Sequence, residues 1–514
     1  MNFDITENAL LGTLEHFNVV GPSDVYPLQP EYSLLLASPA STAKAIYKRL
    51  QCFDWTEKSA YAPAIAGYVE TGLGALRRSL YIDPLLDILL TSLVAQLAQS
   101  IEHQRLPRHL NRVFSYRWKP RGGTWFDIEM GWSEFEIEER LCLQNAHFVA
   151  IVDIGRFYES IRPSTVEAAL RSCGASRSQK IAVMKLLRLC SLDDFGLPIG
   201  GTASRILAEA CLTPIDHALH LEGIHFIRFV DDFRIFADNL LDLKRALWFL
   251  GRALGNKGLA LNKSKTRILS SQEYFDQLDV EPRSLLTRNA AGKASLVIDR
   301  YDPYSQLVGQ CIEELKTISK TQSLDQALAY EFEKLEPSYR SLKFLFAALQ
   351  FADPAEMKRA LTMTFNQLET GMLNRLSLQL ERAVGACAAH LSDDVKTKFS
   401  EILWHHVDNQ QCSTPDGTVG HWIRTIGHLK VSWQASSIPE WRRRFSAAKH
   451  SLIVQRELLR LQILANNNSL LGVMQECESS GNPWLRGLCF ALAKGKKTAV
   501  AQGTQLEQLM THLK

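Results

Sequence analysis

The sequence predicts an α+β fold, in which a ferredoxin-like sheet is followed by an all-helical repeat domain. Between residues 148 and 269, short apolar strands alternate with helices in the order β-α-β-β-α, the split arrangement of a ferredoxin-like sheet. From about residue 303, apolar residues recur at helical spacing only, in segments that run from Leu324 to Cys477. The turn-rich stretch 273–300 separates the two patterns.

Three segments are therefore expected along the chain. Residues 1–110 read as mostly helical, residues 111–290 contain the mixed sheet, and residues 291–514 form stacked helix pairs of the α-solenoid type. In the mixed segment, a strand is expected at His147–Asp153 and two more strands within Ile224–Ala237.

Composition is that of an ordinary globular protein. The 514 residues are 46% apolar and 22% charged, and a net charge of +3 does not by itself indicate a nucleic-acid binder. The ten cysteines form no C-x-x-C pair and are typical of reduced core residues in a cytoplasmic protein. The N-terminus does not resemble a signal peptide. The most apolar segment, Leu85 to Ala98, is too short and too polar to span a membrane, so no membrane partner is expected.

Two runs of cations stand out locally. The stretch from Gln104 to Arg121 holds six Lys or Arg, no acid, and three interleaved aromatic residues, which suits phosphate contact with base stacking. A second run joins Trp441-Arg442-Arg443-Arg444 to Lys449, Arg456 and Arg460. We interpret this second run as a solvated helix face, with nucleic-acid contact as the alternative.

Three carboxylates end short apolar strands. Asp231 and Asp232 are adjacent within the stretch Ile227–Ile235, and Asp153 follows Ile151-Val152. Carboxylates are costly at such positions unless a cation binds them. Two divalent metals ~4 Å apart would satisfy three carboxylates, and that arrangement supports nucleotidyl transfer.

Four stretches occur in an informative order: Asp153 to Tyr158, Gly196 to Ser204, Phe229 to Asp232, and Gly258 to Thr266. In this order they resemble palm motifs A, B, C and D of a reverse transcriptase, over about residues 75–270. The resemblance implies a right-hand polymerase with fingers and palm, and a nucleotidyltransferase activity that makes DNA.

The resemblance assigns roles to the acids and to one lysine. Asp153 and Asp231 would bridge two Mg²⁺ ions, with Mn²⁺ as the alternative metal, and Asp232 would be a weaker or outer ligand. Lys265 would protonate or neutralise the leaving pyrophosphate, with a solvated face as the alternative reading.

Further residues are expected at the substrate. Tyr158 would block a ribose 2′-OH and so select dNTPs, and Phe157 beside it is a second candidate substrate contact, with a core aromatic as the alternative reading. Gly200 and Gly201, with Ser204 after them, would let the backbone approach a template nucleotide. Arg112 and Arg117 are candidate triphosphate clamps, by position and charge.

Departures from the common pattern point to one subfamily. Ile199 replaces the usual Gln, which removes a polar group from the template pocket. The run Ser204-Arg205-x-x-Ala208-Glu209 resembles the abortive-infection reverse transcriptases of bacterial antiphage defence. Arg205 and Glu209, four apart on a helix, are expected to pair with each other.

This subfamily resemblance implies further properties. The helical C-terminal region resembles the family's helical-repeat domain, and the family makes untemplated DNA attached to a protein tyrosine, in homo-oligomers. Tyr26, Tyr32, Tyr47 and Tyr61 are candidate priming residues, although a structural role is the more common one for each. The alternatives are an RNA-templated reverse transcriptase with a partner noncoding RNA, a non-catalytic nucleic-acid-binding scaffold, and an RNA-dependent RNA polymerase, which Tyr158 opposes.

Overall fold

The structure is a computed structural model. It describes residues 4–280 and 316–510, apart from gaps at 24, 53, 56, 73–74, 128–129, 191–195, 317–318, 321–322, 335–336, 338, 368–372, 411–413, 431–437, 465–481, 493–505 and 507–508. Most of the predicted boundary stretch 273–300 and the last expected helical segment, Leu470–Cys477, lie outside the described residues.

The chain forms two compact units, and each unit draws on separate stretches of sequence. Unit 1 comprises Met1–Pro22, Pro39–Lys58 and Leu85–Leu307. Unit 2 comprises Ser23–Ser38, Ser59–Pro84 and Val308–Lys514. The prediction of three consecutive segments did not include this interleaving, because local apolar spacing does not tell which distant helix a segment packs against.

A four-stranded antiparallel sheet forms the centre of unit 1. Its order is β6-β7-β5-β8, with β5 at Phe148–Asp153, β6 at His225–Phe229, β7 at Asp232–Ala237 and β8 at Arg267–Ser270. The register sets Asp153 opposite Asp232 and Phe229 opposite the same residue. The predicted α+β fold and its strands around the acidic turn are confirmed, and the acids meet at one end of the sheet.

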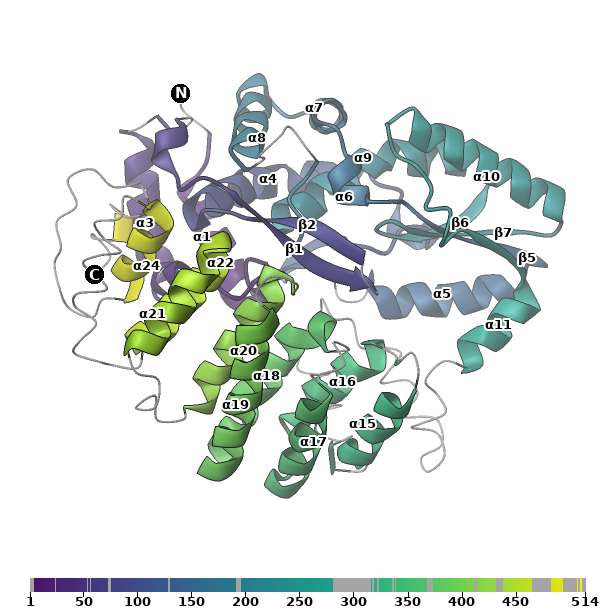
Figure 1. Ribbon diagram of the computed structural model, residues 1–514. Coiled ribbons are helices and arrows are strands. Elements are labelled where there is room, and N and C mark those ends of the chain that lie inside the picture. The colour runs from purple at the N-terminus through teal and green to yellow at the C-terminus, as the bar shows by residue number, and fades with distance from the viewer. Residues whose placement is uncertain are drawn as a thin grey trace. The chain divides into compact units, whose positions relative to one another are not determined.

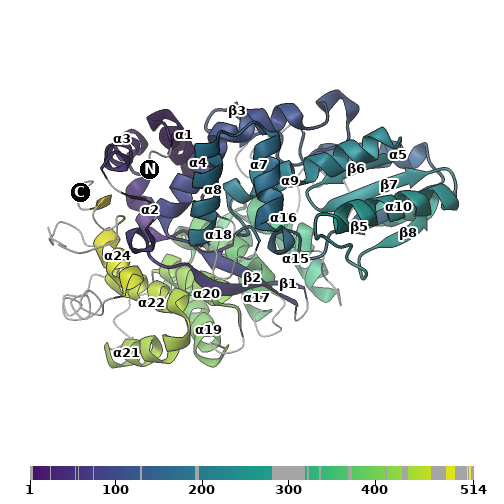
Figure 2. The same ribbon diagram turned by 90° about the horizontal axis from the view of Figure 1, so that it is seen from above.

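Helices cover both faces of this sheet (Figures 1 and 2). Helix α10, Leu240–Gly255, begins at an Asn239 cap and buries Leu243, Leu250 and Leu254 against one face. Helix α5, Trp132–Gln144, packs on β6 and β7 from the other face. Helix α9, Thr202–Leu221, lies beside α10 and β6.

Unit 1 contains further helices and strands besides this sheet and its helices. They are α1 (Glu7–Val20), α3 (Pro39–Leu50), α4 (Pro84–Gln104), β3 (Trp118–Arg121), β4 (Thr124–Phe126), α6 (Phe157–Ser160), α7 (Pro163–Ser172), α8 (Arg177–Cys190) and α11 (Ser271–Val280).

Helix α4 is longer than its apolar segment suggested. At 21 residues it is long and apolar enough to cross a membrane by length and composition, and no other helix in the described part of the chain is. However, 72% of its apolar window is buried inside the protein, and a core helix passes the same test.

In the part of unit 2 that the structure describes, helices are combined with a β-hairpin. The helices are α2 (Pro30–Leu35), α15 (Leu324–Glu333), α16 (Tyr339–Leu349), α17 (Pro354–Asn366), α18 (Ser377–Cys387), α19 (Asp393–Gln410), α20 (Asp416–Leu429), α21 (Ile438–Ala447), α22 (Leu452–Leu464) and α24 (Pro483–Leu492). Helices α18, α19 and α22 each pack against α20, and α15 packs against α17 (Figure 1).

The hairpin was not among the elements expected from the sequence. Strands β1, Ile65–Gly72, and β2, Ala75–Tyr81, pair antiparallel within the mostly helical first 110 residues. Strand β1 packs against α20, so the hairpin belongs to unit 2 with the C-terminal helices.

Candidate active site

The turn between β6 and β7 carries the adjacent acids. Val230 and Asp231 connect the strands, and Val230 adopts φ = +55°. A β-branched residue is rarely found in this left-handed region. The conformation costs about 1–3 kcal/mol of stability and persists only where contacts from the surrounding structure hold it. Asp231 is half-buried, and its carbonyl accepts a hydrogen bond of 3.2 Å from the Ile154 amide. The turn is therefore tied to the strand that ends at the third acid.

Asp153 ends β5 and is held from the motif D loop. The Lys265 ammonium donates to one carboxylate oxygen at 3.0 Å, and the Asn262 side-chain amide donates to the other at 2.9 Å. The Asn262 backbone amide also donates to the Asp153 carbonyl at 2.8 Å. The structure thus joins Asp153 and Lys265, as the motif order implied. Sequence reasoning quoted Asn262 within motif D but gave it no role.

Asp232 lies beside a buried cation. Its carboxylate is 3.8 Å from the Arg234 guanidinium, which also pairs with Glu139 at 2.5 Å and meets the Tyr274 hydroxyl at 3.2 Å. Burial raises the pKa of the Asp232 carboxyl above its ordinary value, and Arg234 offsets this only in part. The environment therefore disfavours an extra negative charge at Asp232 and favours a cation beside it.

The three carboxylates offer oxygen donors of the kind that Mg²⁺ prefers. Among the residues that the structure describes, no group of three or more His, Cys, Asp or Glu side chains could hold a metal ion by itself. Magnesium seldom needs such a cage, because it keeps several waters and shares one or two carboxylates with substrate phosphates. An ammonium already lies against Asp153, which shows that a cation suits this position. The donor set fits the metals that motifs A and C imply.

Tyr158 lies in the short helix α6, directly after the motif A strand. It is half-buried, and its carbonyl accepts a hydrogen bond of 2.8 Å from the Leu197 amide. Gly196 has φ = +56°, and a Cβ there would lie 2.5 Å from the Tyr158 carbonyl oxygen. Motifs A and B are thus held together by a backbone approach that glycine permits. Phe157 is buried among core residues, so its predicted place at the substrate is corrected to a core role.

The glycines of motif B precede helix α9. Gly200 has φ = +93°, and Gly201 caps the helix. Both are partly exposed, as a site for close nucleotide approach requires. Ser204 is 2% exposed within α9 and faces the interior, so it does not reach a substrate in this structure.

The two predicted triphosphate clamps make internal contacts. Arg117 is 2% exposed, and its guanidinium bonds to the Glu102 carboxylate at 2.8 Å and to the Leu106 carbonyl at 3.0 Å. Arg112 donates to the Phe226 carbonyl at 3.2 Å, towards the end of β6 that lies away from the acidic turn. Burial lowers the pKa of both guanidinium groups. These contacts correct the prediction, because neither arginine is directed at the three acids.

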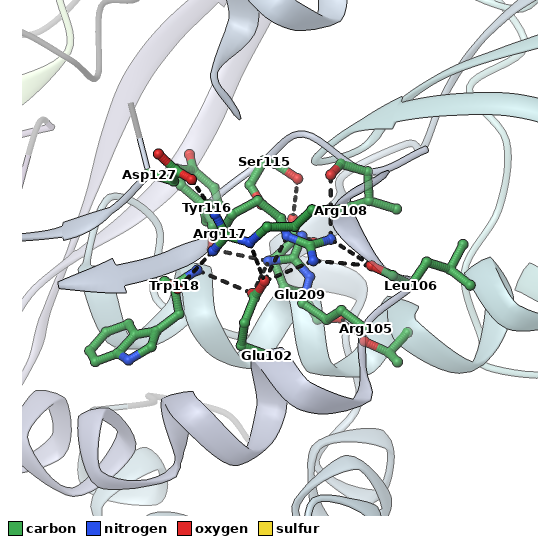
Figure 3. A network of polar contacts seen from close by, with 12 residues as sticks. Glu102, Arg105, Leu106, Arg108, Ser115, Tyr116, Arg117, Trp118, Asp127 and Glu209 are labelled. Carbon is green, nitrogen blue, oxygen red and sulfur yellow. Dashed lines mark hydrogen bonds and ion pairs between the residues drawn. The ribbon is translucent and has the colours of Figure 1, made fainter. Parts of the chain in front are cut away.

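Most arginines of the basic stretch 104–121 form ion pairs or hydrogen bonds inside the protein rather than an exposed basic face. Figure 3 shows Arg105, Arg108 and Arg117 around Glu102 and Glu209. Lys119 and Arg121 are the cations of this stretch with exposed positions. The expected phosphate-and-stacking surface is therefore reduced to its C-terminal end.

The expected pair between Arg205 and Glu209 does not form. The Arg205 guanidinium lies 5.4 Å from the centre of the Tyr116 ring, whereas Glu209 pairs with Arg105 and Arg228 at 2.8 and 2.9 Å. Because Glu209 is buried, its carboxylate pairs with the buried guanidinium groups of Arg105 and Arg228 rather than with Arg205. Sequence reasoning gave no role to Arg228 or to Arg234. The available signal was a charged residue within each of two otherwise apolar strands.

The sequence comparison agrees with this geometry. Residues 90–286 match the family described as "Reverse transcriptase (RNA-dependent DNA polymerase)". This segment is similar to a reverse transcriptase domain. The match spans both the acidic turn and motif D, and it assigns the chain's chemistry to nucleotidyl transfer of the RNA-directed DNA polymerase class. No protein of curated function matches the chain.

Two solved telomerase structures are similar to this chain. The first is apo telomerase from Candida tropicalis, at 10% identity and a TM-score of 0.33, covering 87% of this chain and 73% of that one. The second is telomerase from Candida albicans in complex with a TWJ fragment of telomeric RNA, at 11% identity and a TM-score of 0.32, covering 84% and 67%. These TM-scores are too low to carry a functional conclusion.

Proposed function

We propose that the chain is a reverse-transcriptase-like DNA polymerase of bacterial antiphage defence, acting by abortive infection in the cytoplasm. The observation that carries the polymerase chemistry is the meeting of Asp153, Asp231 and Asp232 at one end of the palm sheet, with Lys265 against Asp153. The defence role is supported by the Ser204-Arg205-x-x-Ala208-Glu209 run and by Ile199 in motif B.

The proposed chemistry uses the residues of motifs A, C and D. Asp153 and Asp231 would hold two Mg²⁺ ions, and Asp232 would be the weaker ligand beside Arg234. Bound there, the metals would supply Lewis-acid activation of the attacking hydroxyl and charge neutralisation of the leaving pyrophosphate. Lys265 supplies a proton or a positive charge to the same pyrophosphate. Tyr158 excludes ribonucleotides, so dNTPs are the substrates and DNA is the product.

Untemplated synthesis from a protein tyrosine is the finer part of the proposal. Ile199 is partly exposed in the loop before α9, where it gives a template base no polar partner. Of the four candidate priming residues, Tyr26, Tyr32 and Tyr61 are buried. Tyr47 is the one with a partly exposed side chain, so it is the candidate that we retain. Assembly into a homo-oligomer belongs to the same proposal.

An RNA-templated enzyme with a partner noncoding RNA is the second candidate. The family description of residues 90–286, an RNA-dependent DNA polymerase, favours it. A non-catalytic scaffold is opposed by three carboxylates at one end of the palm sheet, which a purely binding role does not require.

One incubation separates these candidates. Purified full-length protein is mixed with Mg²⁺ and one labelled dNTP or NTP, without nucleic acid, and the products are run on a denaturing gel before and after protease and nuclease. A dNTP label that leaves the protein band only after protease or nuclease supports protein-primed, untemplated synthesis. Incorporation only after RNA is added supports the templated candidate instead.

The control is the double variant Asp231→Asn with Asp232→Asn, which keeps the side-chain size and removes the charges. It is expected to abolish incorporation, and undiminished incorporation would reject the metal assignment. Expressed in bacteria, the same variant is expected to lose protection against phage. Full protection by an inactive variant would separate the defence role from DNA synthesis.

A further inference from the structure

Arg228 is a fully buried arginine two residues before the catalytic turn. Its guanidinium donates to both oxygens of Asp216, at 2.8 and 2.5 Å, and to Glu209 at 2.9 Å. The same group donates to the Val230 carbonyl at 2.8 Å. A guanidinium presents five N–H donors in a rigid fork, so one arginine can hold two carboxylates and a carbonyl at once.

The carbonyl that Arg228 holds belongs to the strained residue of the turn. Val230 lies at φ = +55°, and its carbonyl is part of the peptide group that carries the Asp231 nitrogen. On the other side of Asp231, the Ile154 amide holds the Asp231 carbonyl at 3.2 Å. The two peptide groups that flank the metal-binding residue Asp231 are thus both held, one by the amide of Ile154, directly after β5, and the other by the guanidinium of Arg228.

Arg228 belongs to a larger buried network, of which Figure 3 shows the part around Glu102 and Glu209. Glu209 also binds Arg105 at 2.8 Å and the Ser115 hydroxyl at 2.5 Å. Arg105 continues to Glu102 at 3.3 Å, and Glu102 binds Arg117 at 2.8 Å. Three buried arginines therefore alternate with three buried carboxylates, and only Arg228 among them is recorded in contact with the turn.

Stability alone is a weak reason for such a network. Apolar residues of similar volume usually replace buried ion pairs without loss of stability. What apolar packing does not supply is a directed donor to the Val230 carbonyl. The opposed charges of Glu209 and Asp216 in turn fix the guanidinium and keep it ionised, since burial alone would lower the pKa of Arg228 and the two acids raise it.

We propose that Arg228 is the positioning residue of the metal-binding turn. It holds the Val230–Asp231 peptide in its strained conformation and so directs the Asp231 carboxylate, while Glu209 and Asp216 on helix α9 anchor its guanidinium. Arg105, Glu102 and Arg117 complete the charge balance without touching the turn.

The test compares two buried arginines of the same network, one at the turn and one away from it. The variants are Arg228→Lys and Arg228→Met, with Arg117→Met as the matched control. For each we measure thermal unfolding, kcat and KM for dNTP incorporation, and the Mg²⁺ concentration for half-maximal rate. Binding of Mn²⁺ to the protein alone is followed by its electron paramagnetic resonance signal.

Both methionine variants are expected to lower the unfolding temperature, because each leaves a buried carboxylate short of a partner. Arg228→Lys keeps the charge but not the fork. It is expected to lower kcat at least about tenfold and to weaken Mn²⁺ binding by a similar factor, with KM little changed. Arg117→Met is expected to leave kcat and Mn²⁺ binding within about twofold of the parent.

Wild-type kcat and Mn²⁺ affinity in Arg228→Lys would overturn the proposal. So would an equal loss of Mn²⁺ affinity in Arg117→Met, since the network would then act through stability alone. If Arg228→Met does not fold, Arg228→Lys carries the comparison. The Mn²⁺ measurement needs no template, primer or nucleotide, so its result is independent of whether the defence polymerase proposal holds.

Discussion

The Lys265 ammonium lies 3.0 Å from a carboxylate oxygen of Asp153, with 62% of the lysine side chain exposed. An exposed cation therefore lies against a carboxylate that a divalent metal would also need. Lys265 would compete with the metal for this carboxylate, and its long flexible side chain could leave when the metal binds. Its next partner would then be the phosphate chain of the substrate.

Replacing Lys265 is expected to separate chemistry from metal binding. In Lys265→Met, kcat for nucleotide addition falls about 10²-fold, because the proton or charge at the leaving group is lost. The Mg²⁺ concentration for half-maximal rate falls as well, because nothing positive competes for Asp153. Both quantities come from Mg²⁺ titrations of incorporation. Lys263→Met is the matched control, since Lys263 is exposed in the same loop. Equal effects of the two variants would argue against a specific role.

Tyr158 is expected to set the choice of sugar. Removing its ring in Tyr158→Ala opens space for a 2′-OH, so the ratio of kcat/KM for dNTP over NTP falls by about 10²-fold, the upper range for a steric difference in a pocket. Tyr158→Phe keeps the ring and is expected to keep the ratio. Single-nucleotide incorporation with each sugar measures it. Unchanged discrimination in the alanine variant would place the gate elsewhere.

Gly196 is expected to be intolerant of a side chain. In Gly196→Ala the new Cβ would meet the Tyr158 carbonyl oxygen at 2.5 Å and the Glu159 backbone at 2.6 Å, so the motif A turn must move. We expect loss of activity together with lowered stability.

Gly174 offers the matched control for that substitution. It also has a positive φ, +75°, but no heavy atom lies within 4 Å of the added Cβ. Gly174→Ala is therefore expected to show the backbone cost alone, about 1–2 kcal/mol in denaturant unfolding, with activity retained. If both variants lose activity alike, the close approach of motifs A and B is not what matters.

His16 is expected to make unit 1 sensitive to acid. It is buried, stacks on Trp125 at 4.2 Å, and bonds to the Gly123 carbonyl and the Thr202 hydroxyl. Burial lowers the pKa of His16 to about 4 from 6.5. Between pH 4 and pH 6.5, His16 is therefore protonated in the unfolded chain but neutral in the folded chain. Stability is full above pH 6.5 and falls by about 3 kcal/mol as the pH approaches 4.

His16→Phe tests this loss of stability at low pH, because phenylalanine keeps an aromatic ring stacked on Trp125 but has no titratable group. Urea unfolding at pH 7 and pH 4.5 is expected to differ less in the variant than in the parent, although the variant is weaker at pH 7 through its lost hydrogen bonds. An unchanged difference between the two pH values would assign the acid sensitivity to other groups.

Arg456 is expected to hold unit 2 together. It is fully buried and binds both oxygens of Glu31 at 2.7 Å, which joins helix α22 to helix α2 near the start of the chain. Arg456→Met leaves a buried, unpaired carboxylate, at a cost of about 3–5 kcal/mol. The exposed Arg443, 3.4 Å from Asp408, is the control, and its loss is expected to cost less than about 1 kcal/mol. Hydrogen exchange of α22 and α2 measures both, and equal protection in the two variants would contradict the assignment.

This pair also shows where the sequence-based interpretation of the C-terminal cations was incomplete. Arg456 is buried rather than solvated, and Arg444 pairs with Asp408 at 2.8 Å while its guanidinium lies 4.1 Å from the centre of the Trp404 ring. Helical spacing placed these cations on a helix, but it carried no information about acids far away in the chain.

The palm could be predicted because its information is local. Short apolar strands that end or turn at Asp153 and at Asp231, with a glycine loop and a lysine loop in order, predict the strand–turn–strand geometry and the identity of the acids. The same holds for helices such as α10, whose cap Asn239 and apolar spacing are visible in the sequence.

Only the tertiary structure decided which charged and polar side chains lie at the site and which stabilise the fold. Four residues with chemistry suited to substrate contact are buried or directed elsewhere: Arg112, Arg117, Phe157 and Ser204. Two arginines that the sequence did not single out lie beside the acids or their turn: Arg228 and Arg234. The tertiary structure also decided that the hairpin β1–β2 and helix α2 join the C-terminal helices in unit 2. The physical reason is the same in each case. Burial and charge pairing depend on residues distant in the chain, and desolvation leaves a buried charge stable only beside an opposite one.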